Sequence, residues 1–380
     1  MTYNALVSGE GRLNIAVLWM LSPEGDRFLA GGLERWCRDL ALLAASKGCR
    51  VTVYQKAVRS FDRAIAEKVR VIGVPVPLSF RGNWRFARWL EKNSDPNEPI
   101  VFVSQELCLS RQFRRSVCVN HGIWWDGDYP AWKKIFLKRL QYRLLCRTRA
   151  TICVDTNYIN WCHAELPNRR VWQKKLLYVP NYADCGRFPG LLRAPRGDGV
   201  RLLYPRRLSG SSLTEDGRGI GLLLEAFQTL LNRGLDVHLT CVGPGPARSA
   251  VKNWAEGHGC QERINLLESD LDGMAEIYRD ADVVVVPSTA HEGTALAAVE
   301  GIVSGKSVVA SHIGGLPNIV LDGLTGYLCD LSAESLASAI EKAIRSGPPP
   351  QPVLEAARRC LGKERWETQV WSHLQQFLSL

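Results

Sequence analysis

Short apolar runs alternate with amphipathic segments along almost the whole chain. The runs are rich in Val, Ile and Leu and are only four to seven residues long, which is typical of strands buried on both faces of a parallel sheet. We expect eleven such strands, at 13–19, 49–54, 69–74, 100–103, 116–119, 151–154, 200–204, 237–242, 264–267, 282–286 and 307–310.

The segments between these runs repeat apolar residues at helical spacing, so we expect helices that connect parallel strands by right-handed crossovers. The clearest helices cover 35–47, 132–147, 222–232 and 295–303. Alternation of strand and helix in both halves predicts the α/β class, with two doubly wound, Rossmann-like domains. A segment rich in Gly, Pro and Arg separates the halves, so we place one domain at 1–187 and the other at 188–362.

The net charge of +10 is unevenly distributed. Residues 1–190 carry 30 Lys and Arg against 16 Asp and Glu, whereas residues 191–380 carry 18 against 22. A basic first half leaves three partners open at this point: nucleic acid, an anionic membrane surface and a phosphate-linked acceptor.

Other sequence patterns argue against several classes of protein and of binding site. No apolar run reaches the roughly 18 residues of a membrane span, and we expect no signal peptide. The 12 cysteines include no C-x-x-C pair, which argues against zinc and thioredoxin-type sites and favours buried thiols. Neither a G-x-G-x-x-G nor a Walker loop occurs, which argues against dinucleotide binding and ATP hydrolysis.

The stretch 288–330 contains the strongest candidates for functional residues. A buried strand is followed by a loop at 291–294 and a helix, whose first N–H groups would suit a diphosphate. Glu292 precedes this helix, and Glu300 lies within it after seven intervening residues. The chain continues with glycine-punctuated segments at 305–311, 314–315, 318–320 and 323–326.

This series resembles the donor site of family 4 glycosyltransferases. The resemblance implies that Glu292 lies beside the donor sugar and that Glu300 hydrogen-bonds the ribose of the nucleotide. It further implies donor contacts at the start of the helix, from Gly293, Thr294, Ala295 and Leu296. A chance glutamate pair with both carboxylates in solvent is the alternative for these residues.

Two segments of the first half also resemble this family. Gly31 and Gly32 begin a Gly-Gly-x-Glu segment that precedes a helix. In the family this segment faces the donor phosphate and the acceptor. A plain tight turn is the alternative interpretation of the two glycines. His121 follows the strand 116–119 and matches a histidine that approaches the donor sugar, although a lone histidine is also compatible with a structural role.

The cations of the second half match the family less regularly. Arg207 stands at the position of a family arginine, and Arg218 stands where a lysine is usual, after an apparent insertion at 210–216. Arg206 replaces a glycine, so a surface salt bridge and a substrate contact both remain open for it. Gly243 belongs to a turn that lies close to the nucleotide in similar enzymes.

The resemblance implies the GT-B arrangement, in which the two domains face a cleft and helix 363–380 crosses back to the first domain. The implied activity is transfer of a hexose from a nucleotide sugar to a saccharide hydroxyl, with retention at the anomeric carbon. Arg207, Arg218 and helix N-termini would offset the charge of the diphosphate, so we expect no metal and no cofactor. A related epimerase or phosphorylase and a non-catalytic sugar-nucleotide-binding protein are the alternatives.

The acceptor side is expected in the basic half. Its excess charge is concentrated between residues 111 and 175, where tryptophans at 124, 125, 132 and 172 are interleaved. We expect a cytoplasmic enzyme that docks on the inner membrane face and extends a lipid-linked saccharide, such as an O-antigen, with no nucleic-acid partner. A soluble small-molecule acceptor is the alternative.

Helix 132–147 could present an apolar face of Ile135, Leu137, Leu140, Leu144 and Leu145 to lipid, although a packed helix with a solvated basic face is slightly favoured.

Overall fold

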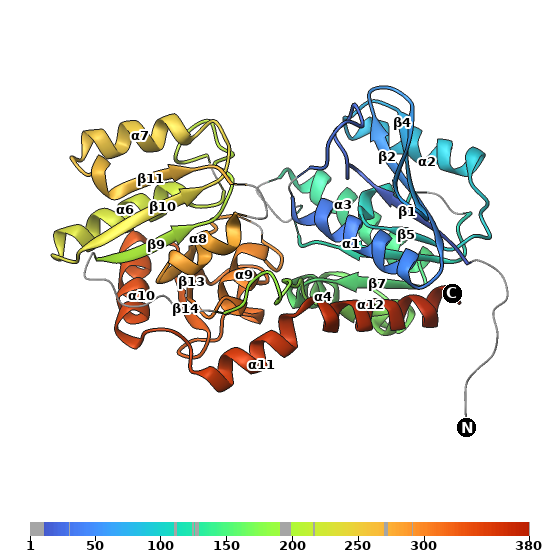
Figure 1. The fold of residues 1–380 in the computed structure, drawn as a ribbon. Helices are drawn as coiled ribbons and strands as arrows, with labels where there is room; N and C mark the ends of the chain where they lie inside the picture. Colours follow the sequence, from blue (N-terminus) through green and yellow to red (C-terminus); the bar gives the residue numbers. More distant parts are fainter. Residues whose placement is uncertain are drawn as a thin grey trace.

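The computed structural model describes residues 11–379 except 30, 110–111, 124, 126–128, 191–198, 216, 270–272 and 291. It contains two α/β domains that lie side by side (Figure 1). Residues 191–198 of the linker predicted at 183–199 lie outside the described residues, as do Trp124 and, in the predicted insertion, Asp216. Within the described part, no helix is both long and apolar enough to span a bilayer.

The first domain is built on an eight-stranded sheet with the order β3-β4-β2-β1-β5-β6-β7-β8. All neighbours in it are parallel except β3 and β4. Its strands are β1 (Arg12–Val17), β2 (Arg50–Ala57), β3 (Phe61–Ala66), β4 (Val69–Pro75), β5 (Ile100–Phe102), β6 (Ser116–Asn120), β7 (Ala150–Cys153) and β8 (Leu176–Tyr178).

The second domain is built on a six-stranded, fully parallel sheet with the order β11-β10-β9-β12-β13-β14. Its strands are β9 (Val200–Tyr204), β10 (Val237–Val242), β11 (Ile264–Leu267), β12 (Val283–Val286), β13 (Ser307–Ser311) and β14 (Gly326–Cys329). The four valines of β12 are buried on both faces, which is why this strand has no polar alternation.

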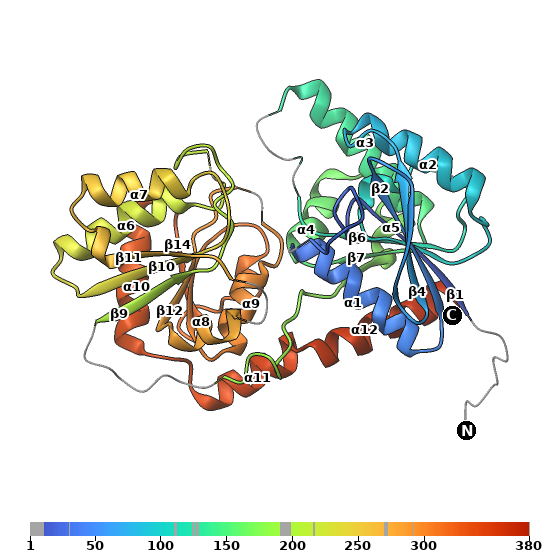
Figure 2. The same cartoon turned by 45° about the horizontal axis from the view of Figure 1, so that its top comes forward.

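Helices cover both faces of each sheet (Figures 1 and 2). Those of the first domain are α1 (Gly32–Ser46), α2 (Arg81–Asn93), α3 (Ala131–Arg147), α4 (Thr156–Glu165) and α5 (Arg169–Trp172). Those that follow are α6 (Ile220–Asn232), α7 (Arg248–Gly257), α8 (Met274–Asp280), α9 (Leu296–Val303), α10 (Ala333–Ser346), α11 (Gln351–Leu361) and α12 (Lys363–Leu378).

The last helix returns to the first domain, as the sequence suggests. The chain crosses over where Gly362 forms a β-bridge with Ala183, and α12 then lies along the first domain (Figure 2). Trp366 packs against Trp36 and stacks on Tyr182, with ring centroids 5.3 and 4.1 Å apart. The aromatic residues of this helix therefore belong to the core of the first domain rather than to a ligand site.

Some elements were not expected from the sequence. The antiparallel edge strand β3 alternates Arg, Asp and Ala with few buried positions, and it pairs with β4 through a register shift. Its mostly exposed pattern lacks the apolar run on which the other predictions depend. Helices α2, α4, α5, α7, α8, α10 and α11 and strands β8 and β14 were not individually predicted either.

Candidate active site

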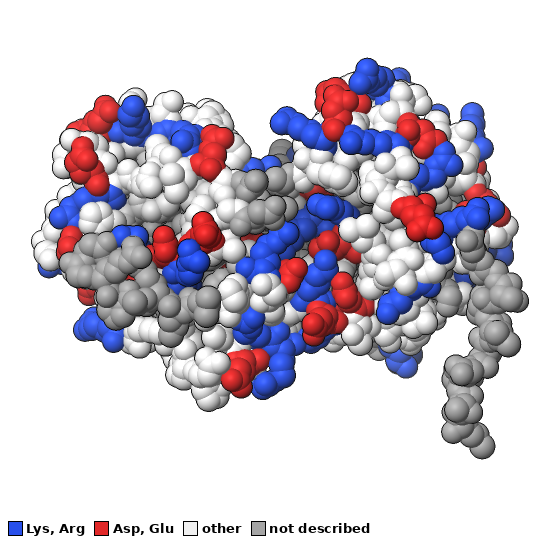
Figure 3. All heavy atoms as spheres, in the orientation of Figure 1, with Lys and Arg blue, Asp and Glu red and all other residues white. Residues whose placement is uncertain are grey.

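A cleft of about 850 Å³ lies between the two domains, lined by residues that follow the carboxyl ends of their strands. All thirteen residues predicted for the site line it: Gly31, Gly32, His121, Arg206, Arg207, Arg218, Gly243, Glu292, Gly293, Thr294, Ala295, Leu296 and Glu300. Figure 3 shows Lys and Arg side chains gathered at the boundary between the domains. A cavity of this size suits a ligand as large as a nucleotide sugar.

Glu292 is held in place by Arg206. The guanidinium of Arg206 lies 2.5 Å from Oε2 of Glu292 and also donates to Oγ of Ser288, which itself donates to the same carboxylate oxygen at 2.9 Å. The interpretation of Arg206 as a surface salt bridge is wrong, because this side chain is buried. Arg206 positions the half-buried Glu292, since a buried guanidinium needs a charged partner of this kind.

Arg207 and Arg218 extend this cluster toward the cleft. Arg207 is exposed, and its charge acts on Glu34 of the first domain. Burial and the nearby charge of Arg206 lower the pKa of Arg218, whereas Glu292 acts in the opposite sense. Arg206 pairs with Glu292 and Arg218 lies within the field of that carboxylate, while Arg207 acts on Glu34, so three cations and two carboxylates meet here and the excess positive charge favours binding of an anion.

Glu300 has both carboxylate oxygens engaged. Oε1 lies 2.6 Å from Nη1 of Arg35, and Oε2 accepts a hydrogen bond from the hydroxyl of Tyr278 at 3.0 Å. Arg35 belongs to α1 of the first domain, so this buried ion pair joins the two domains across the cleft. A ribose bound by Glu300 would share this carboxylate with Arg35.

Gly293 and Thr294 lie in close contact with the first domain. A Cβ at Gly293 would lie 2.7 Å from the carbonyl oxygen of His121, so only glycine allows the backbones to approach this closely. The hydroxyl of Thr294 donates to the carbonyl of Val154, and Asn181 donates to the Thr294 carbonyl at 2.6 Å. The Thr294 side chain and carbonyl therefore both contact the first domain, which leaves the backbone N–H for the predicted donor contact.

Two helices begin at the cleft. Gly31 is the N-cap of α1 and Ala295 is the N-cap of α9, and neither cap is closed by a side-chain hydrogen bond. The first turn of α9 therefore retains N–H groups for an anionic ligand, whereas in α1 the Glu34 carboxylate interacts with its own backbone N–H. Gly243 has a φ of 149°, and a Cβ there would lie 2.6 Å from the carbonyl oxygen of Arg206, so glycine is needed where this turn passes the arginine cluster.

His121 lies where the two domains meet, with its ring edge against Trp36 at 5.7 Å between centroids. Burial lowers the pKa of His121 to about 4, although a hydrogen bond with the Val103 backbone opposes this shift. The imidazole is therefore neutral at pH 7. Its Nε2 is withdrawn from solvent and has no hydrogen-bond partner within the described residues. This nitrogen can accept a hydrogen bond from a sugar hydroxyl.

Asp155 is a titratable group near the site that the sequence interpretation missed. It caps α4, where Oδ1 accepts from the Tyr158 N–H at 2.9 Å, while Oδ2 has no partner among the described residues. Burial raises the pKa of Asp155 to about 6, and the negative charge of Glu292 adds to this shift.

We expect Asp155→Asn to stabilise the protein at neutral pH. The folded-state pKa of Asp155 is above its ordinary value of 3.8, so its ionisation costs stability as pH rises from about 4 to 6, by about 3 kcal/mol in full. Asparagine caps a helix equally well and carries no charge. The melting temperature of the variant should exceed that of wild type at pH 7.5 and match it near pH 4. Surface Asp236→Asn is the control, and parallel pH profiles for Asp155→Asn and wild type would contradict the expectation.

No group of three or more His, Cys, Asp or Glu side chains that could hold a metal ion occurs among the residues that the structure describes. The sequence contains Asp-x-Asp pairs at 126–128, 270–272 and 280–282, of which the first two lie outside the described residues. Asp282 precedes β12 and accepts from the Arg201 N–H at the start of β9. This pair is therefore at the amino edge of the sheet, opposite the cleft.

Sequence interpretation also missed three partners of the predicted glutamates: Arg35, Ser288 and Tyr278. Each lies on a different element, so only the folded chain brings them to Glu292 or Glu300. The one available signal was Arg35, a cation in the first turn of a helix expected to face the cleft.

Comparisons with known proteins agree with this geometry. A profile described as "Glycosyltransferase Family 4" matches residues 30–185, and one described as "Glycosyl transferases group 1" matches residues 208–346. The chain is 34% identical to a D-inositol 3-phosphate glycosyltransferase of Corynebacterium diphtheriae, covering 86% of this chain and 85% of that protein. It is 33% identical to the lipopolysaccharide 1,2-N-acetylglucosaminetransferase of Salmonella typhimurium, over 45% of this chain and 46% of that protein.

Solved structures share the fold. Sucrose-phosphate synthase from Thermosynechococcus elongatus superposes with a TM-score of 0.75 at 18% identity, over 97% of this chain and 99% of that chain. HepE of Anabaena in complex with UDP gives 0.68 at 16% identity, over 96% and 100%.

Fold and cleft together define a glycosyltransferase of the GT-B class, an enzyme that uses a nucleotide-sugar donor. The chain belongs to glycosyltransferase family 4.

Proposed function

We propose that this enzyme transfers a hexose to a saccharide hydroxyl with retention of anomeric configuration and without a divalent metal. The observation that carries the proposal is the convergence of three arginines, one anchored glutamate and a neutral histidine on one cleft. These groups supply what glycosyl transfer from a diphosphate needs: charge for the leaving group and polar contacts for the sugar.

The leaving diphosphate is the main charge to be stabilised. Arg207 and Arg218 lie on the second domain, and α9 begins beside them with an uncapped first turn. Fixed cations and N–H groups stabilise the charge that develops as the glycosidic bond breaks, without reorganisation of solvent. In this proposal they do what a divalent metal does in other transferases.

Glu292 serves in positioning and electrostatics rather than as a nucleophile. Its Oε2 accepts from Arg206 and Ser288, which fixes the position of the carboxylate. Retention then follows if the acceptor oxygen attacks the face from which the phosphate departs. The C–O bond to phosphate breaks, the C–O bond to acceptor forms, and the acceptor proton passes to the leaving phosphate oxygen.

The acceptor proposed is a lipid-linked saccharide of a bacterial surface polysaccharide, reached from the cytoplasmic face of the membrane. One relative acts on lipopolysaccharide by its name, and the basic first half suits an anionic bilayer. Relatives named for inositol 3-phosphate favour the alternative of a soluble acceptor.

Helix α3 carries the surface that would meet lipid, but on a different face from that predicted. Leu137, Leu144 and Leu145 are buried in the domain, so they cannot contact a membrane. The exposed apolar residues are instead Trp132, Ile135 and Phe136, at 70%, 52% and 46% exposure. Their i, i+3, i+4 spacing places them on one side of the first two turns, with lysines at 133, 134 and 138 on the same helix.

We expect the protein to float with anionic vesicles at low salt and to be released at high salt, since basic residues contribute about 1 kcal/mol each at such a surface. A triple variant with serine at 132, 135 and 136 should lose most of this binding, because it removes the exposed apolar face without touching the core. Serine at exposed Leu324 and Leu331 of the second domain is the matched control. Failure of wild type to float at any salt, while it transfers sugar to a water-soluble acceptor, would refute the membrane proposal.

The proposed reaction is tested by release of nucleoside diphosphate. A melting-temperature screen against nucleoside diphosphates and their sugars should identify the donor, because a ligand that binds only the folded state raises the melting point. With that donor, nucleotide release should require acceptor and persist in excess EDTA. Loss of release that magnesium or manganese restores would refute metal independence.

A further inference from the structure

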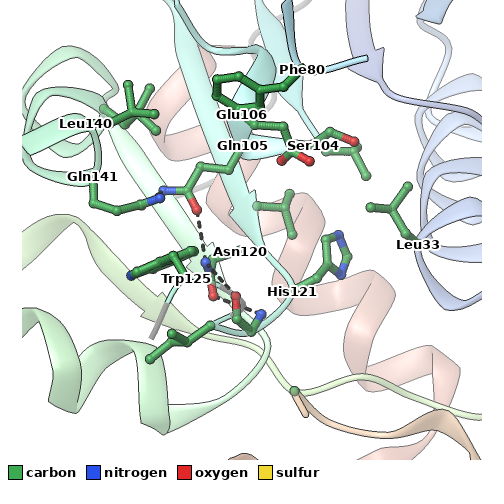
Figure 4. A pocket seen from close by; sticks show the side chains of 16 residues that line it. Leu33, Phe80, Ser104, Gln105, Glu106, Asn120, His121, Trp125, Leu140 and Gln141 are labelled. Atoms are coloured by element: carbon green, nitrogen blue, oxygen red, sulfur yellow. Dashed lines mark hydrogen bonds between the residues drawn. The ribbon is translucent and has the colours of Figure 1, made fainter. Parts of the chain in front are cut away.

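A second, smaller pocket of about 150 Å³ adjoins the cleft inside the first domain. It shares Leu33, His121 and Gly293 with the cleft, so the two cavities meet where the sugar would be transferred. Figure 4 shows its walls, which come from the residues that follow β5, from β6 and the loop after it, from α3 and from the short helix η1 (Gln105–Leu107). The volume is about half the lower limit of ~300 Å³ for drug-sized ligands, so it admits one ring or one substituent.

Most polar groups of this pocket already have partners. Asn120 donates to Gln105 at 2.9 Å, and Gln105 donates to Gln141 at 2.6 Å and to the Tyr158 hydroxyl at 3.1 Å. Oγ of Ser104 accepts from the Leu18 N–H at 2.9 Å. These bonds fix the wall of the pocket.

The side chain of Glu106 differs from these hydrogen-bonded polar groups of the pocket. Its carboxylate projects into the pocket toward the side where His121 lies (Figure 4). Among described groups it interacts with its own backbone N–H and with the charge of Lys56, while burial raises the pKa of Glu106. Lys56 is itself held by the carbonyls of Leu78 and Ser79 and by Asn83, each at 2.9 Å, so it does not neutralise Glu106 by direct contact.

Two side chains that can accept hydrogen bonds therefore line this space: the Glu106 carboxylate and the neutral imidazole of His121, whose Nε2 has no hydrogen-bond partner among the described residues. Acceptors bind hydroxyl groups, which donate. No Lys or Arg occurs among the described residues that line the pocket. A phosphate placed here would meet a carboxylate and no cation, and like charges at close range repel strongly.

We propose that this pocket is the acceptor subsite, that Glu106 is its specificity-determining residue, and that it takes an uncharged, hydroxyl-bearing ring rather than a phosphorylated one. This rests on the proposed transferase function, and it separates the enzyme from relatives named for inositol 3-phosphate. Glu106 orients the ring by accepting from its hydroxyls, so that a neighbouring hydroxyl faces the donor sugar in the cleft.

The test is ligand-observed NMR with the full chain and saturating nucleoside diphosphate. The probes are methyl α-D-glucopyranoside, methyl α-D-mannopyranoside and myo-inositol, each compared with its phosphate monoester. At least one uncharged probe should bind more tightly than its phosphate, and Glu106→Gln should weaken that binding about tenfold, since a hydrogen bond to a charged group is lost. Surface Glu165→Gln, whose carboxylate pairs with Lys138, is the matched control and should change nothing.

Tighter binding of the phosphates, absence of binding by all three uncharged probes, or equal affinity in Glu106→Gln and wild type would each overturn the proposal. Nucleoside diphosphate affinity of Glu106→Gln, measured by calorimetry, should equal that of wild type and shows that the variant is folded. Failure of the transferase function is a separate result: nucleotide would then not be released from donor with any acceptor, charged or uncharged.

Discussion

Arg218→Ala is expected to lower kcat by roughly 10²–10³, the usual cost of removing one preorganised group that stabilises transition-state charge. The side chain is partly buried beside Arg206, and burial together with that charge lowers its pKa, so an anion bound in the cleft would stabilise the charge of Arg218. Arg218→Lys should recover part of the rate, because the charge returns without the planar fork that binds phosphate at two points.

The measurement for Arg218→Ala is initial-rate release of nucleoside diphosphate at saturating donor and acceptor. Arg263→Ala is the control, since Arg263 pairs with Asp236 outside the cleft. Full activity of Arg218→Ala would mean that the segment inserted at 210–216 has moved the second cation away from the diphosphate. Arg38, which also lines the cleft, would then be the next candidate.

Glu300→Gln should weaken donor binding by at least tenfold. A hydrogen bond to a charged group is worth about 1.5–3 kcal/mol, and the ribose would lose such bonds with the carboxylate. Calorimetry with the donor nucleotide measures the change. Unchanged affinity would remove Glu300 from the donor site.

The same substitution also breaks the ion pair with Arg35, so the two effects must be separated. Arg35→Met is the matched variant: it removes the contact between the domains and leaves the Glu300 carboxylate in place. It should lower the melting temperature and change donor affinity far less than Glu300→Gln. Equal losses of affinity in the two variants would assign the effect to the domain contact instead of the ribose.

The strands that frame the cleft could be predicted because burial on both faces removes polar residues from them. β12 is four consecutive valines, and no helix or surface strand of this protein has that pattern. The edge strand β3 could not be predicted in this way, since solvent on one side allows Arg and Asp within it. On α3 the apolar residues fall on two faces, so the sequence left open whether Ile135 packs inside or faces solvent.

The site was predictable as a set of positions but not as a set of contacts. The family resemblance placed Glu292 before a helix and Glu300 within it, where the structure has them. Spacing could not show that Arg206 is the buried partner of Glu292, or that Arg35 crosses the cleft to Glu300, because these pairs are separated by 86 and 265 residues. Glu106 carries no motif at all, and only the shape of the pocket around it indicates a role.

The most direct test of the central claim is proton NMR of the product formed from an α-configured nucleotide hexose and acceptor in excess EDTA. The account predicts an α-linked product, with one nucleoside diphosphate released for each bond formed. A β-linked product, or transfer that occurs only after magnesium or manganese is added, would contradict it.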